Sequence, residues 1–159
     1  MVMKRRKLVT TILYKPIAEF VSKTNHKTLA IWAADCAERV LPYFEEKYPE
    51  DTRPRKAIEA CREWARTGVF RMADVRKTAL AAHAAARDVK EDNAANSAAR
   101  AAGHAVATAH VPTHSLAAAI YAATAVRDIT NSSDYDIATT KERDWQYQHL
   151  LRLIGKLSS

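Results

Sequence analysis

The scarcity of glycine and proline is the feature that most constrains how this chain can fold. Only three glycines and five prolines occur in 159 residues. These residue types supply most of the tight turns that strands and hairpins need, and both fall below their average frequencies of about 7% and 5%. Alanine, which has the highest helix propensity, is concentrated between Ala79 and Ala125. The sequence therefore predicts an all-α protein.

Length and linker composition favour a single helical domain that spans residues 1–159. A chain of this length can bury about two thirds of its unfolded surface in one core, whereas two domains would each have a small core. No Gly/Ser-rich linker divides the chain. The net charge is +7, and the first seven residues, MVMKRRK, hold four of the cations. We expect residues 1–8 to form a mobile, basic N-terminal segment.

Apolar periodicity and helix-stop residues divide the chain into about six helices. Asn25 can cap the first of them, and Pro42 predicts a break near its end. Gly68 can end the second helix, and Pro112 separates the fourth from the fifth. Because the connections are short, we expect stacked antiparallel hairpins. The predicted helices span about residues 26–48, 52–68, 72–90, 93–110, 113–128 and 137–154.

Residue size predicts how these helices pack. Faces made of alanine and glycine let helix axes approach closely, so the third, fourth and fifth helices should form a tight centre. Trp32, Trp64 and Trp145 need wider spacing and should form the walls around that centre. Cys36 and Cys61 lie in amphipathic patterns, and we expect both to be reduced and buried.

Four histidines and one aspartate raise the question of a metal-dependent enzyme. They are His83, His104, His110, His114 and Asp35. His110 and His114 have the four-residue spacing that places two ligands on one helix face, but a proline breaks the helix between them. Histidines that form hydrogen bonds between helices are therefore the leading interpretation. An interhelical His/Asp metal site is the alternative.

Other signatures of catalysis, cofactor binding or membrane insertion are absent from the sequence. There is no GxSxG motif, and the three glycines are isolated, so no glycine-rich loop can hold a phosphate. We therefore expect no catalytic residues and no cofactor. No run approaches the ~18 apolar residues of a membrane span, and no secretion signal is apparent. These features predict a cytoplasmic protein without a membrane segment.

Charged residues on the first two predicted helices are the candidates for binding a partner. Opposite charges recur at i,i+3 and i,i+4 spacing, which is typical of a solvated, salt-bridged face. Arginine and tryptophan are also the residues that most often anchor protein interfaces, so part of this face could recognise a protein. The candidate protein-binding residues are Asp35, Arg39, Arg53, Arg55, Arg62 and Trp64.

The sequence gives less support to other partners. Acidic residues interleave with basic ones throughout, and no nucleic-acid-binding motif occurs, which argues against DNA or RNA outside the cations at residues 4–7. The sequence is also compatible with a homo-oligomer.

Three segments carry a resemblance to a known family. They are WAADCAERVLPYFE at residues 32–45, RPRKAIEACREWA at residues 53–65, and GHAVATAHVPTHSLAAAIYAA at residues 103–123. Over about residues 29–125 the chain resembles the immunity-5-like family of small helical immunity proteins, and both ends lie outside the resemblance. The resemblance implies an all-helical, non-enzymatic protein that binds and neutralises a cognate toxin. It assigns no catalytic residues.

Overall fold

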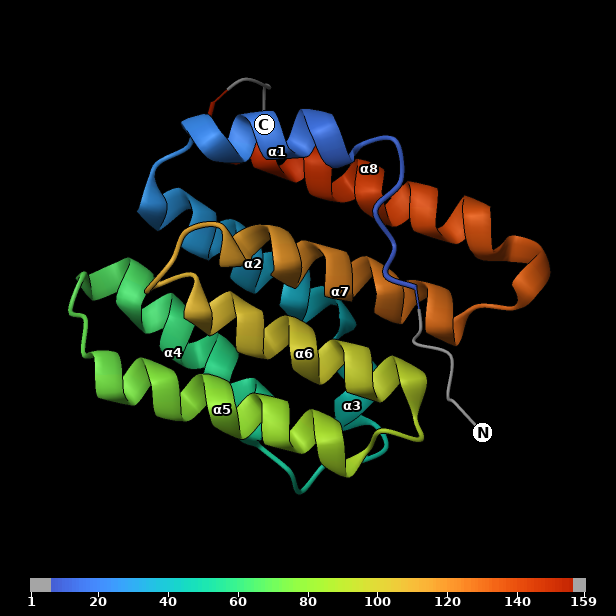
Figure 1. The fold of residues 1–159 in the computed structure, drawn as a ribbon, viewed down its shortest axis with the longest axis horizontal. Helices are drawn as coiled ribbons and strands as arrows, with labels where there is room; N and C mark the ends of the chain where they lie inside the picture. Colours follow the sequence, from blue (N-terminus) through green and yellow to red (C-terminus); the bar gives the residue numbers. More distant parts are fainter. Residues whose placement is uncertain (1–6, 156–159) are drawn as a thin grey trace.

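Residues 7–155 are described by a computed structural model, and within this range the chain forms only helices, turns and loops (Figure 1). The all-α prediction is confirmed. None of the helices in this range combines the length and the hydropathy that crossing a membrane requires. The helices are α1 (Tyr14–Lys23), α2 (His26–Val40), α3 (Pro42–Glu45), α4 (Arg53–Thr67), α5 (Met72–Asp88), α6 (Asn93–Ala107), α7 (His114–Ile129), the 3-10 helix η1 (Ser132–Asp134) and α8 (Tyr135–Leu153).

Successive helices pack as antiparallel neighbours in a bundle. Helices α5, α6, α7 and α8 contact one another in chain order, and α2 and α4 pack across one side of this row (Figure 1). Helix α1 lies along α8 at the upper edge of Figure 1, where the rings of Phe20 and Tyr147 meet edge to face with centroids 5.9 Å apart. The arrangement agrees with the predicted stack of helical hairpins.

The residues expected to start and stop helices do so. The Asn25 side chain accepts a hydrogen bond of 2.8 Å from the backbone N–H of Thr28 and caps α2. Helix α2 ends before Pro42, which opens the short α3. Gly68 follows α4 with φ of 70°, the left-handed conformation that glycine adopts without steric cost. The chain breaks around Pro112 between α6 and α7, as expected.

Helix α1 was not predicted, and it shows that the N-terminal region joins the fold. Its Ile17 and Val21 are buried. Ahead of it, the backbone N–H of Val9 donates a 3.0 Å hydrogen bond to the Thr124 hydroxyl of α7, and the Lys7 carbonyl accepts one from Arg127. Residues 1–6 of the expected basic segment lie outside the described residues.

The predicted close packing of the third, fourth and fifth helices is present, since α6 makes its most extensive contacts with α7 and α5, but the most buried part of the bundle differs from the prediction in one helix. Helices α6 and α2 hold the largest sets of buried residues, whereas α5 lies at the edge and buries only Ala82, Ala85 and Ala86.

Trp32 was expected to form a wall but is fully buried, where its indole N–H donates a 2.9 Å hydrogen bond to the carbonyl of Gln146. A buried indole with a satisfied N–H can fill a core, so tryptophan size alone did not determine its position.

Both cysteines are buried and unpaired, as predicted. The Cys61 thiol donates to the carbonyls of Ala30 and Ala105, 3.3 and 3.1 Å away, and thereby links α4 to α2 and α6. Burial raises the pKa of Cys61 to about 12 and also raises that of Cys36, so neither thiol is a ready nucleophile.

Candidate functional site

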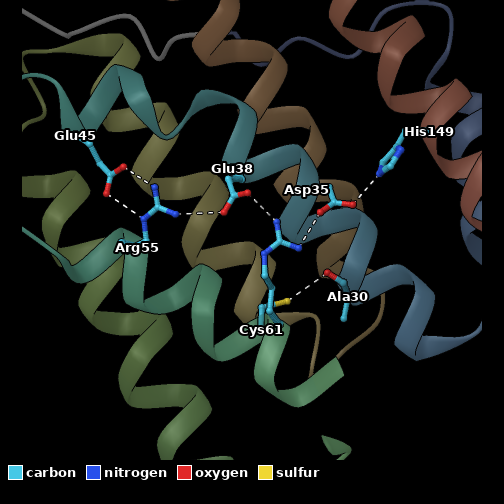
Figure 2. A network of polar contacts seen from close by, with 8 residues as sticks. Ala30, Asp35, Glu38, Glu45, Arg55, Cys61 and His149 are labelled. Carbon is cyan, nitrogen blue, oxygen red and sulfur yellow. Dashed lines mark hydrogen bonds and ion pairs between the residues drawn. The ribbon is translucent and has the colours of Figure 1, made fainter. Parts of the chain in front are cut away.

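A chain of ion pairs joins α4 to α2 and α3 on one face of the molecule (Figure 2). Arg55 and Arg62 are seven residues apart, two helical turns, so they share a face of α4. Arg62 donates to Asp35 at 2.8 Å and to Glu38 at 3.2 Å. Arg55 bridges Glu38 at 3.2 Å and Glu45 at 2.6 Å. Carboxylates and guanidinium groups therefore alternate along this face.

Helix α8 extends the network on the other side of α2. The second oxygen of Asp35 lies 2.7 Å from Nε2 of His149. Arg39 makes a two-pronged contact of 2.8 and 2.9 Å with Glu142, and its guanidinium carbon lies 3.8 Å from the centroid of the Trp145 ring. Trp145 in turn stacks on His149 with centroids 4.6 Å apart. We call the whole set, Asp35, Glu38, Arg39, Glu45, Arg55, Arg62, Glu142, Trp145 and His149, the charged network.

The charged network is partly exposed and slightly hollowed. Asp35, Glu38, Arg39, Trp145 and His149 line a shallow depression of about 360 Å³. A hydrogen bond to Glu142 raises the pKa of Arg39, and a hydrogen bond to Glu45 raises that of Arg55. Both guanidinium groups are thus firmly charged. What the surface offers chemically is a fixed pattern of charged hydrogen-bonding groups, which suits recognition of another macromolecule.

Four of the six predicted binding residues belong to this network, and two do not. Arg53 pairs with Asp51 and Asp88, 2.6 and 2.7 Å away, and so ties the start of α4 to the end of α5. Trp64 packs against the ring of His26, with centroids 4.5 Å apart. Because Trp64 follows Arg62 by two residues, it points about 200° away around the helix.

Sequence reasoning missed the contribution of α8 to the network. Glu142, Trp145 and His149 are spaced three and four residues apart, so they lie on one face of that helix. This spacing was a signal that a polar stripe on α8 faces something. The spacing could not identify the partner of this stripe, because Arg39, which pairs with Glu142, lies 103 residues away from it along the chain.

Three of the four histidines converge at the row of α5, α6 and α7. The rings of His83 and His104 meet edge to face with centroids 4.9 Å apart, and Nδ1 of His104 lies 3.2 Å from Nδ1 of His114. Of the other two residues considered for a metal site, His110 stacks on Phe70 instead, and Asp35 is held in the charged network. We call His83, His104 and His114 the histidine cluster.

Burial keeps the histidine cluster neutral. It lowers the pKa of His83 to about 4 and that of His104 to about 3, and it lowers the pKa of His114 as well. The Arg100 guanidinium, 2.9 Å from Nδ1 of His83, adds to the effect, because that nitrogen must accept the hydrogen bond. The structure therefore agrees with hydrogen-bonding histidines.

The metal alternative does not match this arrangement. Across residues 7–155, no group of three or more His, Cys, Asp or Glu side chains is placed to hold a metal ion. The carboxylate proposed to join the imidazoles binds Arg62 and His149 instead.

Comparison with known proteins supplies the family. The family described as Imm-5 like putative immunity protein matches residues 19–153. The match extends at both ends beyond the resemblance over residues 29–125, and takes in the second half of α1 and all of α8. No curated protein and no solved structure gives a significant match. Since the family match covers far more than half of the chain, the chain belongs to the Imm-5 like putative immunity proteins.

Proposed function

We propose that this chain is a cytoplasmic immunity protein that neutralises a cognate toxin by binding it and covering its active surface. The observation that carries the proposal is the family match over residues 19–153. On this proposal the protein acts in stoichiometric amounts and catalyses nothing. An interface of standard size, about 1,200–2,000 Å² in total, is enough to block a toxin's site.

The charged network is the surface we propose for this contact. Its side chains are already held in place by one another, so a partner that binds them meets a smaller loss of side-chain entropy. Arg39, Glu38 and Arg55 are among its more exposed members, with 40%, 45% and 35% of their side chains accessible. Such a surface favours a toxin with a complementary charge pattern.

Co-expression with the product of the neighbouring gene, as the candidate toxin, tests the proposal. The intact chain should restore growth to cells that produce the toxin. Replacing Arg55 and Arg62 together by glutamate should weaken protection, because like charges then face Glu38 and Asp35 and the pattern presented to the toxin is reversed. Growth rate at graded toxin levels is the measurement.

Two controls separate lost binding from lost folding. Lys15→Glu with Lys141→Glu makes the same change in net charge at exposed positions of α1 and α8 and should protect as well as the parent chain. Circular dichroism of the purified variants should show unchanged helix content. Toxicity that persists in the presence of the unaltered, folded protein would count against an immunity function. Full protection by the double variant would mean that the charged network is not the surface that binds the toxin.

A further inference from the structure

A second surface lies along the exposed side of α5, and its chemistry differs from that of the charged network. The buried side chains of α5 are alanines in its C-terminal half. In its N-terminal half, Met72 and Leu80 are 44% and 58% exposed, and the loop before it exposes Val69 and Phe70. Large apolar side chains gathered at one place on a surface are a feature of interaction sites.

This side of α5 is hollowed. A groove of about 330 Å³ runs between α5 and the end of α6, and Met72, Ala79, Leu80 and His110 are among its lining residues. A second, shallower hollow of about 620 Å³ continues outward over Met72, Lys77 and Leu80. Together we call these the α5 groove. Hollows of this size can receive apolar side chains of a partner.

The charges along the α5 groove are of one sign. Arg76 and Lys77 line it, and no acidic residue does. None of the ion pairs between residues 7–155 involves either of these two exposed cations. In the charged network, by contrast, Arg39, Arg55 and Arg62 all have carboxylate partners within the chain. The cations of the α5 groove are therefore available to carboxylates from outside.

We propose that the α5 groove binds an acidic amphipathic segment of a protein partner, whose apolar side chains enter the groove beside Leu80 while its carboxylates pair with Arg76 and Lys77. This inference rests on the proposed function in that the partner is taken to be a protein. A lipid surface would also attract cations and apolar groups. It fits less well, because bilayer binding needs a broad, continuous apolar face, whereas Met72 and Leu80 border a hollow between α5 and the end of α6.

The test uses the full chain and two synthetic helical peptides as probes. The acidic probe presents leucines along one face, flanked by glutamates, and the basic probe carries lysine at every glutamate position. Fluorescence anisotropy measures binding. We expect the acidic probe to bind at least about tenfold more tightly than the basic one, and its binding to weaken with added salt.

Matched variants locate the binding. Leu80→Glu should weaken binding of the acidic probe at least about tenfold, because it removes an apolar contact and adds a repelling charge. Ile137→Glu, at a position on α8 that is 60% exposed, should leave binding unchanged. Arg76→Glu with Lys77→Glu should also weaken it, whereas Lys15→Glu with Lys141→Glu makes the same change in net charge away from the groove and should have little effect.

The proposal is overturned by any result in which the acidic probe does not bind specifically at the groove. Equal binding of both probes, or equal losses of affinity in the groove and control variants, would mean that the probes are attracted to the protein without a specific binding site. Leu80-dependent binding to anionic phosphatidylglycerol vesicles, with no binding of the acidic probe, would assign the groove to lipid. If the chain protects fully against the toxin but the acidic probe does not bind, the proposal for the groove fails and the immunity function stands. Specific probe binding without protection would support the groove and count against the immunity function.

Discussion

Gly103 owes its place in α6 to the imidazole of His83. A methyl group at this position would lie 2.8 Å from Cε1 and Nε2 of that ring, closer than real Cβ contacts. The ring cannot easily turn aside, because Arg100 holds Nδ1 and the His104 ring packs against it edge to face. An α6 otherwise rich in alanine thus keeps a residue with poor helix propensity where the His83 ring of α5 lies against it.

Gly103→Ala should therefore destabilise the protein although it improves helix propensity. Overpacking costs about 1–3 kcal/mol, and the gain in propensity is about 1 kcal/mol, so we expect a net loss of about 1 kcal/mol in urea unfolding. In a His83→Ala background the clash is gone, and the same substitution should be neutral or stabilising. A stabilising effect in the parent protein would contradict the close packing of these two residues.

Helices α2 and α8 are joined by an ion pair that is unlike those at the surface. The Glu142 side chain is 8% exposed, and both of its oxygens accept from Arg39. Arg66 and Glu63 on α4 form a pair of similar geometry, but their side chains are 70% and 60% exposed. Solvent screens the second pair and leaves little net stabilisation.

Arg39→Ala should cost more stability than Arg66→Ala. The first leaves a buried carboxylate without its partner, a loss of about 1–3 kcal/mol, whereas the second should change the free energy of unfolding by less than about 0.5 kcal/mol. Thermal and urea unfolding of both variants, with Arg39→Ala/Glu142→Gln as a third, measure the difference. The double variant should recover part of the loss. Equal effects of the two single substitutions would show that Glu142 is solvated.

Local sequence signals predicted most of the elements, and their limits are visible in particular residues. Asn25, Pro42 and Gly68 act on the backbone beside them, so the helix ends they mark were predictable. Helix α1 was missed although Ile17 and Val21 have helical spacing, because the pattern is short and contains a proline in its first turn. In the charged network, spacing placed Arg55 and Arg62 on one face but could not identify α8 as a neighbour, since packing between distant helices sets that contact.

At the scale of the whole bundle, α5, α6 and α7 meet through neutral imidazoles. His83, His104 and His114 come one each from α5, α6 and α7, and His104 also stacks on Tyr121 with centroids 5.2 Å apart. A proton added to one of these rings would place a charge beside other imidazoles and Arg100 in a poorly solvated position. Folding therefore competes with protonation at this cluster.

Acid should unfold the protein partly through the histidine cluster. Because folding lowers the pKa of His83 to about 4 and of His104 to about 3, below the ordinary 6.5, the unfolded chain binds more protons between these values. The stabilising contribution is complete above about pH 6.5 and is lost as the pH falls through this window, on the order of 3 kcal/mol for His104 by about pH 4. Urea unfolding at a series of pH values should show a shallower acid slope for His104→Gln than for the parent chain. Parallel slopes for the parent and His104→Gln would mean that folding and protonation are not coupled at His104, and would contradict this prediction.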